Sequence, residues 1–284
     1  MMSFDRRFPE RRVLITGANS GFGEAMAMLF ARRGWRVAVT GRRPDAVHAA
    51  AQKVRQAGAK EVLELTIDVA VPEHFAAAAA AVEASWGGLD VLVNNAGILD
   101  SGALRDLTLE RWHRAIEINL FGVIHGCNAF LPMMMRQKSG YVCNMASSAG
   151  LFALPEMANY SVSKAAVIAL SETMRAELTP YHIGVTVACP AAFTSALIDN
   201  ARAVDSHISG ASVTLRSLEK DLQAGRHTSE SVAAHCLRAM EKARLYAIAH
   251  PEMHAARLFK RVFPEWSYAL TGWMYANKMW RFKH

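Results

Sequence analysis

The sequence contains few cysteines, and they are not arranged as a disulfide framework or a zinc site. The four cysteines are scattered, with no Cys-x-x-Cys pair, and the eleven histidines show no His-Glu-x-x-His spacing. The N-terminus lacks the apolar core of a signal peptide, and no apolar run reaches the length of a membrane span. We therefore expect a cytoplasmic protein in a reducing compartment, without a metal site.

Neither polar nor charged residues dominate the composition, which is 52% apolar and 20% charged and fits a globular protein of enzyme size. The net charge of +7 indicates anionic partners without choosing among them. The arginines are interleaved with helix and strand patterns and form no tail or RNA motif. We expect attraction for a phosphorylated cofactor and no nucleic-acid partner.

Strand and helix patterns alternate along the chain. Short β-branched or apolar runs predict strands at 12–16, 35–40, 62–67, 90–93, 141–145 and 184–188. Helical patterns separate these strands, the longest at about 108–135. The alternation predicts an α/β fold with a doubly wound parallel sheet, in which ligands bind at the carboxyl ends of the strands.

A glycine-rich turn joins the first predicted strand to the following helix. It reads Gly17-Ala18-Asn19-Ser20-Gly21-Phe22-Gly23. Glycines let the backbone turn sharply and approach a pyrophosphate, and the helix N-terminus supplies amide donors. The spacing is Gly-x3-Gly-x-Gly, and the turn predicts a dinucleotide site.

Two arginines follow the second predicted strand, where an acidic residue would bind the ribose 2′-hydroxyl of NAD. Arg42 and Arg43 stand there after Gly41. Arginine accommodates a 2′-phosphate. The sequence therefore favours NADP(H), with NAD(H) as the alternative.

Tyr160 and Lys164 lie four residues apart in a helical segment and so share one face. A free tyrosine titrates near pH ~10, and a nearby positive charge favours the phenolate. The phenol can then give a proton to a forming alkoxide or take one from an alcohol.

These motifs occur in a fixed order along the chain. The order is Thr16-Gly17-x3-Gly21-x-Gly23, Asn94-Asn95-Ala96-Gly97, Asn119, Ser147 and Tyr160-x3-Lys164. With them, residues 11–249 resemble the short-chain dehydrogenase/reductase family. The resemblance implies a Rossmann-type parallel sheet of about seven strands with helices on both faces, the last strand at 245–249. It also implies hydride transfer between a nicotinamide and a carbonyl or secondary alcohol, by a homodimer or homotetramer.

The resemblance also assigns roles to individual residues. Tyr160 would be the acid/base, and Lys164 would lower its pKa and bind the nicotinamide ribose. Ser147 would hold the substrate oxygen, and Asn119 would position a water and a backbone carbonyl in a proton relay. The other positions expected to contact the cofactor are Gly17, Asn19, Ser20, Gly21, Phe22, Gly23, Arg42, Arg43, Asp68, Val69, Asn95, Ala96, Gly97, Pro190, Phe193, Thr194 and Ser195. Ser195 falls where the family carries a carboxamide-binding threonine, and Thr194 is adjacent, so either hydroxyl could serve.

We expect residues 1–249 to form one catalytic domain, with 191–226 as a substrate-covering segment, and 250–284 to be an aromatic, basic helical extension. Three interpretations of the extension compete. It packs on the substrate lip or a neighbouring subunit, which we favour; it lies on a membrane surface; or it binds nucleic acid, which no motif supports.

The sequence thus predicts an NADP(H)-preferring oxidoreductase. The apolar run 151–155, close after Ser147, indicates a small hydrophobic ketone or secondary alcohol as substrate. A 3-oxoacyl-type reductase is an alternative. A catalytically idle NADP-binding scaffold with a membrane- or partner-binding tail is another, although such a protein would not need Asn119, Ser147, Tyr160 and Lys164 together.

Overall fold

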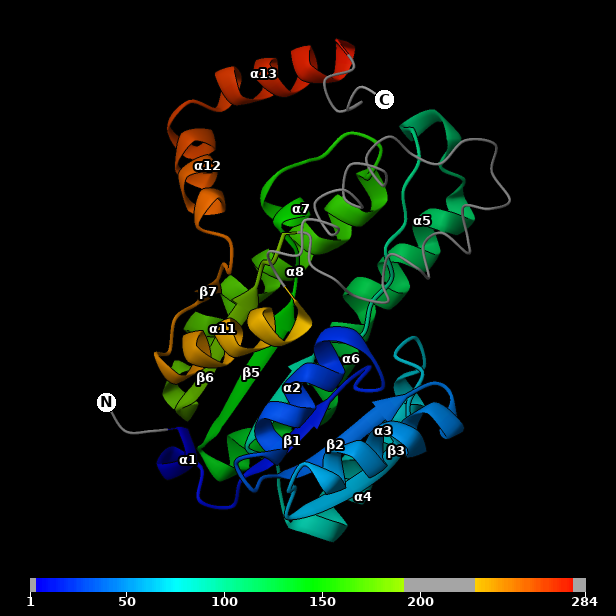
Figure 1. Cartoon of the computed structure of the whole chain (residues 1–284), viewed down its shortest axis with the longest axis vertical. Helices are drawn as coiled ribbons and strands as arrows, with labels where there is room; N and C mark the ends of the chain where they lie inside the picture. The colour runs from blue at the N-terminus through cyan, green and yellow to red at the C-terminus, as the bar shows by residue number, and fades with distance from the viewer. Residues whose placement is uncertain (1–3, 192–227, 278–284) are drawn as a thin grey trace.

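Seven parallel strands form a single sheet in the order β3-β2-β1-β4-β5-β6-β7 (Figure 1). The computed structural model describes residues 4–191 and 228–277. The strands are β1 (Arg12–Ile15), β2 (Arg36–Gly41), β3 (Glu61–Thr66), β4 (Val91–Asn94), β5 (Gly140–Met145), β6 (Ile183–Ala188) and β7 (Tyr246–Ala247). The predicted doubly wound Rossmann-type fold is confirmed. The last strand is shorter than the expected 245–249.

The α-helices are α1 (Phe4–Arg7), α2 (Gly21–Ala31), α3 (Pro44–Gln56), α4 (Pro72–Trp86), α5 (Leu109–Ile116), α6 (Gly122–Gln137), α7 (Ser148–Leu151), α8 (Ala158–Glu177), α11 (Ser229–Glu241), α12 (Pro251–Val262) and α13 (Pro264–Ala276). Helices cover both faces of the sheet, whereas α12 and α13 lead away from it (Figure 1). Several begin at sequence signals: proline is the first residue of α3 and α4, and Thr228 forms a capping box with Ser231 at α11.

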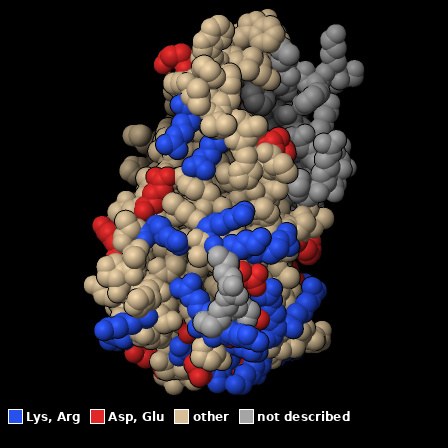
Figure 2. All heavy atoms as spheres, turned by 90° about the vertical axis from the view of Figure 1, so that its left-hand side faces the viewer, with Lys and Arg blue, Asp and Glu red and all other residues tan. Residues whose placement is uncertain are grey.

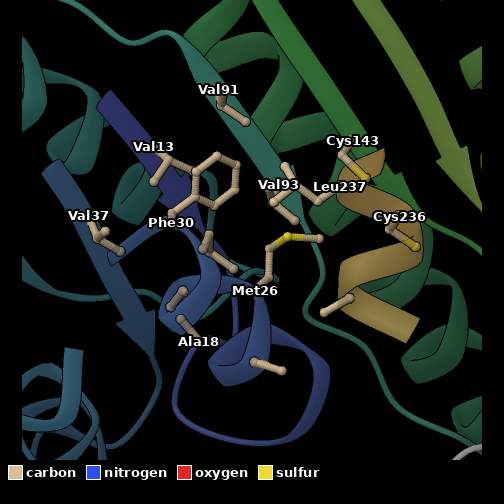
Figure 3. Packing of buried hydrophobic residues seen from close by; sticks show 14 of the residues in the cluster. Val13, Ala18, Met26, Phe30, Val37, Val91, Val93, Cys143, Cys236 and Leu237 are labelled. Carbon is tan, nitrogen blue, oxygen red and sulfur yellow. The ribbon is translucent and has the colours of Figure 1, made fainter. Parts of the chain in front are cut away.

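Alternate residues of each strand face two separate cores. Val13 and Ile15 of β1 belong to the core under α2, α3 and α11, whereas Leu14 belongs to the core under α4, α6 and α8. Figure 3 shows Met26 and Phe30 of α2 pointing into the first core. Because β1, β4, β5 and β6 are buried on both faces, their sequences are nearly continuous apolar runs, whereas the edge strand β3 is partly exposed.

A small aromatic cluster near the amino-terminal ends of β2 and β5 was not predicted. Phe4 of α1 stacks on Trp35 at 5.9 Å between ring centroids and meets Tyr141 edge-on at 5.3 Å. The indole Nε1 of Trp35 donates to Asp5 at 2.7 Å. These contacts hold the N-terminal helix against the sheet.

The long helix predicted at about 108–135 is not continuous. It consists of α5, a π-helical turn at Glu117–Phe121, and α6. The turn contains the fully buried Asn119. A π turn adds one residue per turn and so re-aims a side chain, which is why such turns occur at functional sites.

The same stretch corrects the expectation that no apolar run reaches the length of a membrane span. Leu109–Gln137 is long and apolar enough to cross a membrane by length and composition alone. Core helices of globular proteins meet this criterion too, and the apolar side chains of α6, among them Phe130 and Met134, are buried against the sheet. In this structure the apolarity of the stretch serves the core.

Candidate active site

The glycine-rich turn lies at the carboxyl end of β1, where the strand order reverses between β1 and β4. Gly17 and Gly21 have φ of 63° and 55°, a left-handed conformation that favours glycine. A Cβ on Gly23 would lie 2.3 Å from the carbonyl oxygen of Gly17, so only glycine fits there. Ser20 precedes α2 without a side-chain cap, which leaves the first amides of that helix for an anion.

Two side chains, one directly after β1 and one directly after β4, hold this turn in place. The Thr16 hydroxyl accepts the backbone N–H groups of Asn95 (2.8 Å) and Ala96 (3.0 Å). The Asn95 side-chain amide donates to the carbonyls of Thr16 (2.8 Å) and Gly17 (3.2 Å). Two motifs far apart in sequence are therefore one hydrogen-bonded unit.

The second end of the candidate cofactor site lies after β2 and β3. Gly41 leaves room for Asn19, because a Cβ there would lie 2.7 Å from the Asn19 side-chain oxygen. Arg42 and Arg43 are exposed, and among the described residues neither side chain forms a hydrogen bond or an ion pair. Their guanidinium groups are available to a ligand.

Asp68 and Val69 follow β3 at the same edge of the sheet. Asp68 accepts a hydrogen bond from the N–H of Ala70 at 3.1 Å, and its own N–H donates to His74 at 3.1 Å. The buried Val69 accepts a hydrogen bond through its carbonyl from His125 at 3.0 Å. These bonds fix the loop that carries Asp68 and Val69, two of the positions expected to contact the cofactor.

Tyr160 projects from the first turn of α8 and is 6% exposed. Its hydroxyl is hydrogen-bonded to Ser147, the N-cap residue of α7, whose side chain also accepts the N–H of Ala149 at 3.1 Å. Burial raises the pKa of Tyr160 to about 12, and the Ser147 hydrogen bond opposes this rise. The structure thus brings the predicted acid/base and the predicted substrate-oxygen ligand together.

Lys164 lies one turn further along α8 and is 3% exposed. Its Nζ donates to the carbonyl of Met145 at 2.9 Å and lies 5.8 Å from the ring centroid of Tyr160. Burial lowers the pKa of Lys164 to about 8, with the Cys189 thiol opposing. The sequence-based expectation was that Lys164 lowers the pKa of Tyr160. In this structure burial is the largest influence on the Tyr160 pKa and the Lys164 ammonium donates to Met145, so the expected effect of Lys164 stays a prediction.

Asn119 connects the loop after β4 to α8. Its side chain makes two hydrogen bonds with the backbone of Ile98, accepting from N–H at 2.8 Å and donating to C=O at 3.0 Å. It also donates to the Ser163 hydroxyl at 3.1 Å, which donates to the Tyr160 carbonyl at 2.7 Å. A Cβ on Gly97 would lie 2.9 Å from Asn119 and 3.3 Å from Lys164, so this glycine allows the two side chains to approach.

The end of β6 provides the last of the predicted cofactor contacts. The carbonyl of Pro190 accepts the N–H of Ser148 at 2.8 Å, and Ala191 N–H donates to the buried His250 at 3.2 Å. Phe193, Thr194 and Ser195, and nearly all of the predicted substrate-covering segment 191–226, lie outside the described residues.

Sequence reasoning missed three polar residues near Tyr160, two of them buried and the third half-buried. Asp100, Arg111 and Asn159 form a hydrogen-bonded chain that reaches the backbone of Tyr160. No motif marks them, because they lie in a loop and two helices that meet only in the fold. Among the described residues, no group of three His, Cys, Asp or Glu side chains could hold a metal ion.

The residues present fit a nicotinamide dinucleotide. The packing of Gly17 against Gly23 leaves a surface without side chains for a pyrophosphate. Tyr160 and Lys164 lie near the end of β5, two strands away from β1 at the same carboxyl edge of the sheet. Fold and site together define the class as an α/β dinucleotide-binding protein.

Comparison with known proteins identifies the family. The family profile described as short chain dehydrogenase matches residues 11–205. The chain therefore belongs to the short-chain dehydrogenase/reductase family, which consists of oxidoreductases.

Two relatives illustrate the range of named activities. The chain is 34% identical over 232 residues to a 3-ketodihydrosphingosine reductase from Bacteroides thetaiotaomicron, covering 79% of this chain and 81% of the relative. It is 36% identical over 183 residues to a 2-(R)-hydroxypropyl-CoM dehydrogenase from Xanthobacter autotrophicus, covering 63% of this chain and 73% of the relative.

One solved structure of a relative contains NAD, and another contains NADPH. A short-chain dehydrogenase/reductase from Burkholderia phymatum in complex with NAD has a TM-score of 0.83 at 29% identity, covering 93% of this chain and 96% of that one. A short-chain dehydrogenase from Sphingobium yanoikuyae in complex with NADPH has a TM-score of 0.72 at 26% identity, covering 93% and 94%.

Proposed function

We propose that this protein is an NADP(H)-preferring oxidoreductase that interconverts a hydrophobic ketone and the corresponding secondary alcohol, with Tyr160 as acid/base. One observation carries the proposal: the Tyr160 hydroxyl is hydrogen-bonded to Ser147, with the buried Lys164 on the same helix face. A binding scaffold would have no use for this costly burial of a phenol and an ammonium group.

The roles of the side chains follow from their positions. A bound nicotinamide supplies the hydride in reduction and accepts it in oxidation. Ser147 would hold the substrate oxygen within reach of Tyr160, which would donate its proton to that oxygen as negative charge develops. The raised pKa keeps Tyr160 protonated at neutral pH, as reduction requires. Lys164 would hold the nicotinamide ribose, and Asn119 would support the proton relay.

Arg42 and Arg43 support the cofactor preference. They are exposed beside Gly41 and Asn19 at the end of β2, where a ribose 2′-phosphate would lie. NAD(H) is the alternative, since the Burkholderia phymatum relative was solved with NAD and the Sphingobium yanoikuyae relative with NADPH.

The loop after Ser147 supports an apolar substrate. Leu151, Phe152 and Leu154 are half-buried in this loop. The name of the Bacteroides thetaiotaomicron relative, 3-ketodihydrosphingosine reductase, also denotes a ketone with a long apolar chain. A 3-oxoacyl-type reductase remains the alternative within the same chemistry.

The assay is NADPH oxidation, with NADH in parallel, against ketones and 3-oxo esters graded in chain length and ring size. We expect turnover that rises with apolar bulk and prefers NADPH. Tight NADPH binding without turnover on any substrate would leave the scaffold interpretation in place of the enzyme.

We further propose that residues 1–249 act as one catalytic domain and that 250–284 form an extension on the substrate side. Lys260 of α12 donates to the Leu151 carbonyl at 2.6 Å, and the Tyr275 hydroxyl of α13 bonds the Glu156 carboxylate at 3.3 Å. Both partners lie between Ser147 and α8, Leu151 at the end of α7 and Glu156 in the loop that follows. These contacts support the favoured interpretation that the extension packs on the substrate lip.

The outer side of the extension is a candidate surface for an anionic membrane. Of the thirteen large hydrophobic side chains exposed among the described residues, nine lie at 258–275, including Trp266 (74%) and Trp273 (55%). Figure 2 shows Lys and Arg gathered over the lower half of one face, while the top, where α13 lies, is mostly uncharged. Residues 250–284 contain six Lys or Arg and two Glu. Tryptophan and tyrosine flanked by basic residues suit a headgroup boundary.

Co-sedimentation of the full chain with vesicles tests whether this surface binds a membrane or another copy of the chain. We expect binding to vesicles that contain anionic lipid, weakened by Trp266→Ser with Trp273→Ser. No vesicle binding, with a dimer or tetramer that the two substitutions dissociate in light scattering, would assign the surface to the homo-oligomer instead.

A further inference from the structure

A buried ion pair joins the first turn of α5 to the loop after β4. The Arg111 guanidinium donates through Nε to the Asp100 carboxylate at 3.1 Å, and its Nη2 contacts both that carboxylate and the Ser101 carbonyl. The two charged side chains are 15% and 9% exposed. Burying such a pair costs desolvation energy, so its geometry must be well satisfied.

Asn159 extends this pair to the backbone of Tyr160. It is fully buried, and its side-chain amide donates to the Asp100 carboxylate at 2.7 Å. Its side-chain oxygen accepts the backbone N–H of Tyr160 at 2.8 Å. That N–H is in the first turn of α8, where backbone donors have no partner within the helix, and Met157 at the start of α8 offers no side-chain cap.

The opposite peptide group of Tyr160 is held as well. Its carbonyl accepts the Ser163 hydroxyl at 2.7 Å, and Ser163 is in turn bonded to Asn119. Tyr160 is thus fixed through its N–H by the chain Arg111–Asp100–Asn159 and through its carbonyl by Ser163.

The backbone just before α8 is also tied to the loop after β4. Gly102 N–H donates to the Glu156 carbonyl at 2.7 Å, and Gly102 pairs with Met157 in an isolated parallel bridge. Glu156 has φ of 60°, a left-handed conformation that is uncommon for a non-glycine residue and is kept where neighbours hold it. The ion pair therefore belongs to a larger set of contacts between the loop after β4 and the start of α8, and these contacts fix where α8 begins.

We propose that Asp100, Arg111 and Asn159 are positioning residues that set the Tyr160 hydroxyl against the substrate oxygen. The carboxylate orients the Asn159 amide, Arg111 neutralises and orients the carboxylate, and Asn159 holds the first turn of α8. Proton transfer needs the donor within hydrogen-bond reach, and small displacements of a reacting group are costly. The inference rests on the proposed role of Tyr160 as acid/base.

The test compares four variants with the wild type in NADPH-dependent ketone reduction. Asn159→Ala removes the two hydrogen bonds that connect the Asp100 carboxylate to the backbone of Tyr160. Asp100→Asn keeps the side-chain shape but removes the charge. Ser171→Ala is the matched control, because Ser171 is a buried polar residue of the same helix that bonds Val167 and Asn144 away from Tyr160. Tyr160→Phe reports whether the proposed chemistry occurs at all. For each, kcat, KM, NADPH affinity and the solvent deuterium isotope effect on kcat are measured.

We expect Asn159→Ala to lower kcat by about 10- to 100-fold and to raise the solvent isotope effect, with NADPH affinity unchanged. Asp100→Asn should do the same to a smaller extent and serves alone if Asn159→Ala does not fold. Ser171→Ala should change neither quantity. Full kcat and an unchanged isotope effect in the two network variants, with Tyr160→Phe inactive, would overturn the inference alone. Full activity in Tyr160→Phe would overturn the proposed function instead.

Discussion

The ammonium group of Lys164 donates a hydrogen bond to the backbone carbonyl of Met145 at 2.9 Å, at the end of the strand that leads to Ser147. The same burial that fixes this contact lowers the pKa of Lys164 to about 8. In the unfolded chain a lysine titrates near pH ~10.4. Between the two values the unfolded state binds more protons, so this group makes the protein more stable as pH rises through that window.

The first prediction uses this difference. From about pH 7 to about pH 9.5, we expect the free energy of unfolding of the wild type to rise by about 2 kcal/mol relative to Lys164→Met. Denaturant unfolding of both proteins at the two pH values measures it. Lys53→Met is the control, because its side chain is 60% exposed, and its difference from the wild type should not depend on pH. A gap between wild type and Lys164→Met that is constant with pH would contradict the lowered pKa.

The second prediction concerns cofactor choice. Replacing Arg42 and Arg43 together by Ala should weaken NADPH binding by about 10- to 100-fold, because hydrogen bonds between charged groups contribute about 1.5–3 kcal/mol. NADH binding should change little, since NADH has no 2′-phosphate. Fluorescence titration of both cofactors measures the two effects, with the exposed Arg105→Ala as control. Equal losses for NADPH and NADH would show that the two arginines contribute charge but do not recognise the phosphate.

The third prediction concerns the glycine turn. Gly23→Ala places a methyl group 2.3 Å from a backbone oxygen of Gly17, so the turn must shift. We expect a loss of stability of about 1–3 kcal/mol and loss of NADPH-induced thermal stabilisation. Gly272→Ala, in α13 with nothing within 4 Å of the added atom, should leave both quantities unchanged or slightly raised. Normal stabilisation of Gly23→Ala by NADPH would place the dinucleotide elsewhere.

The fourth prediction concerns the opposite end of the sheet. Arg12 at the start of β1 makes hydrogen bonds to Asp90 through its side chain at 2.8 and 3.1 Å and its N–H at 2.9 Å. Asp90→Asn should cost about 3–5 kcal/mol of stability, because it leaves a buried guanidinium without a counter-charge. Glu83→Gln breaks the exposed pair with Arg136 and should cost at most about 1 kcal/mol. Similar costs for the two variants in denaturant unfolding would mean that Arg12 is solvated.

The sheet and most of the site could be predicted from the sequence because their signals are local. Buried strands are continuous apolar runs, and a glycine turn between a strand and a helix marks the dinucleotide site wherever it occurs. Tyr160 and Lys164 share a helix face by spacing alone. The starts of α3 and α4 also have a local signal, because proline favours the first position of a helix and Pro44 and Pro72 stand there.

Other features depend on the folded chain and have no local signal. The π turn at Glu117–Phe121 interrupts a helical pattern that runs through it unbroken. Asp100 and Asn159 are 59 residues apart in sequence and meet only when the loop after β4 packs against α8. The raised pKa of Tyr160 arises from burial, which spacing does not report, and the effect expected of Lys164 stays a prediction.

The most direct test of the account is the rate of NADPH oxidation by Tyr160→Phe with the best apolar ketone, measured beside NADPH affinity. The substitution removes only the hydroxyl that bonds Ser147. We predict a fall in kcat of about 100-fold or more, as expected for loss of a general acid, with NADPH bound as tightly as by the wild type. Turnover by Tyr160→Phe close to that of the wild type would contradict the assignment of Tyr160 as the proton donor.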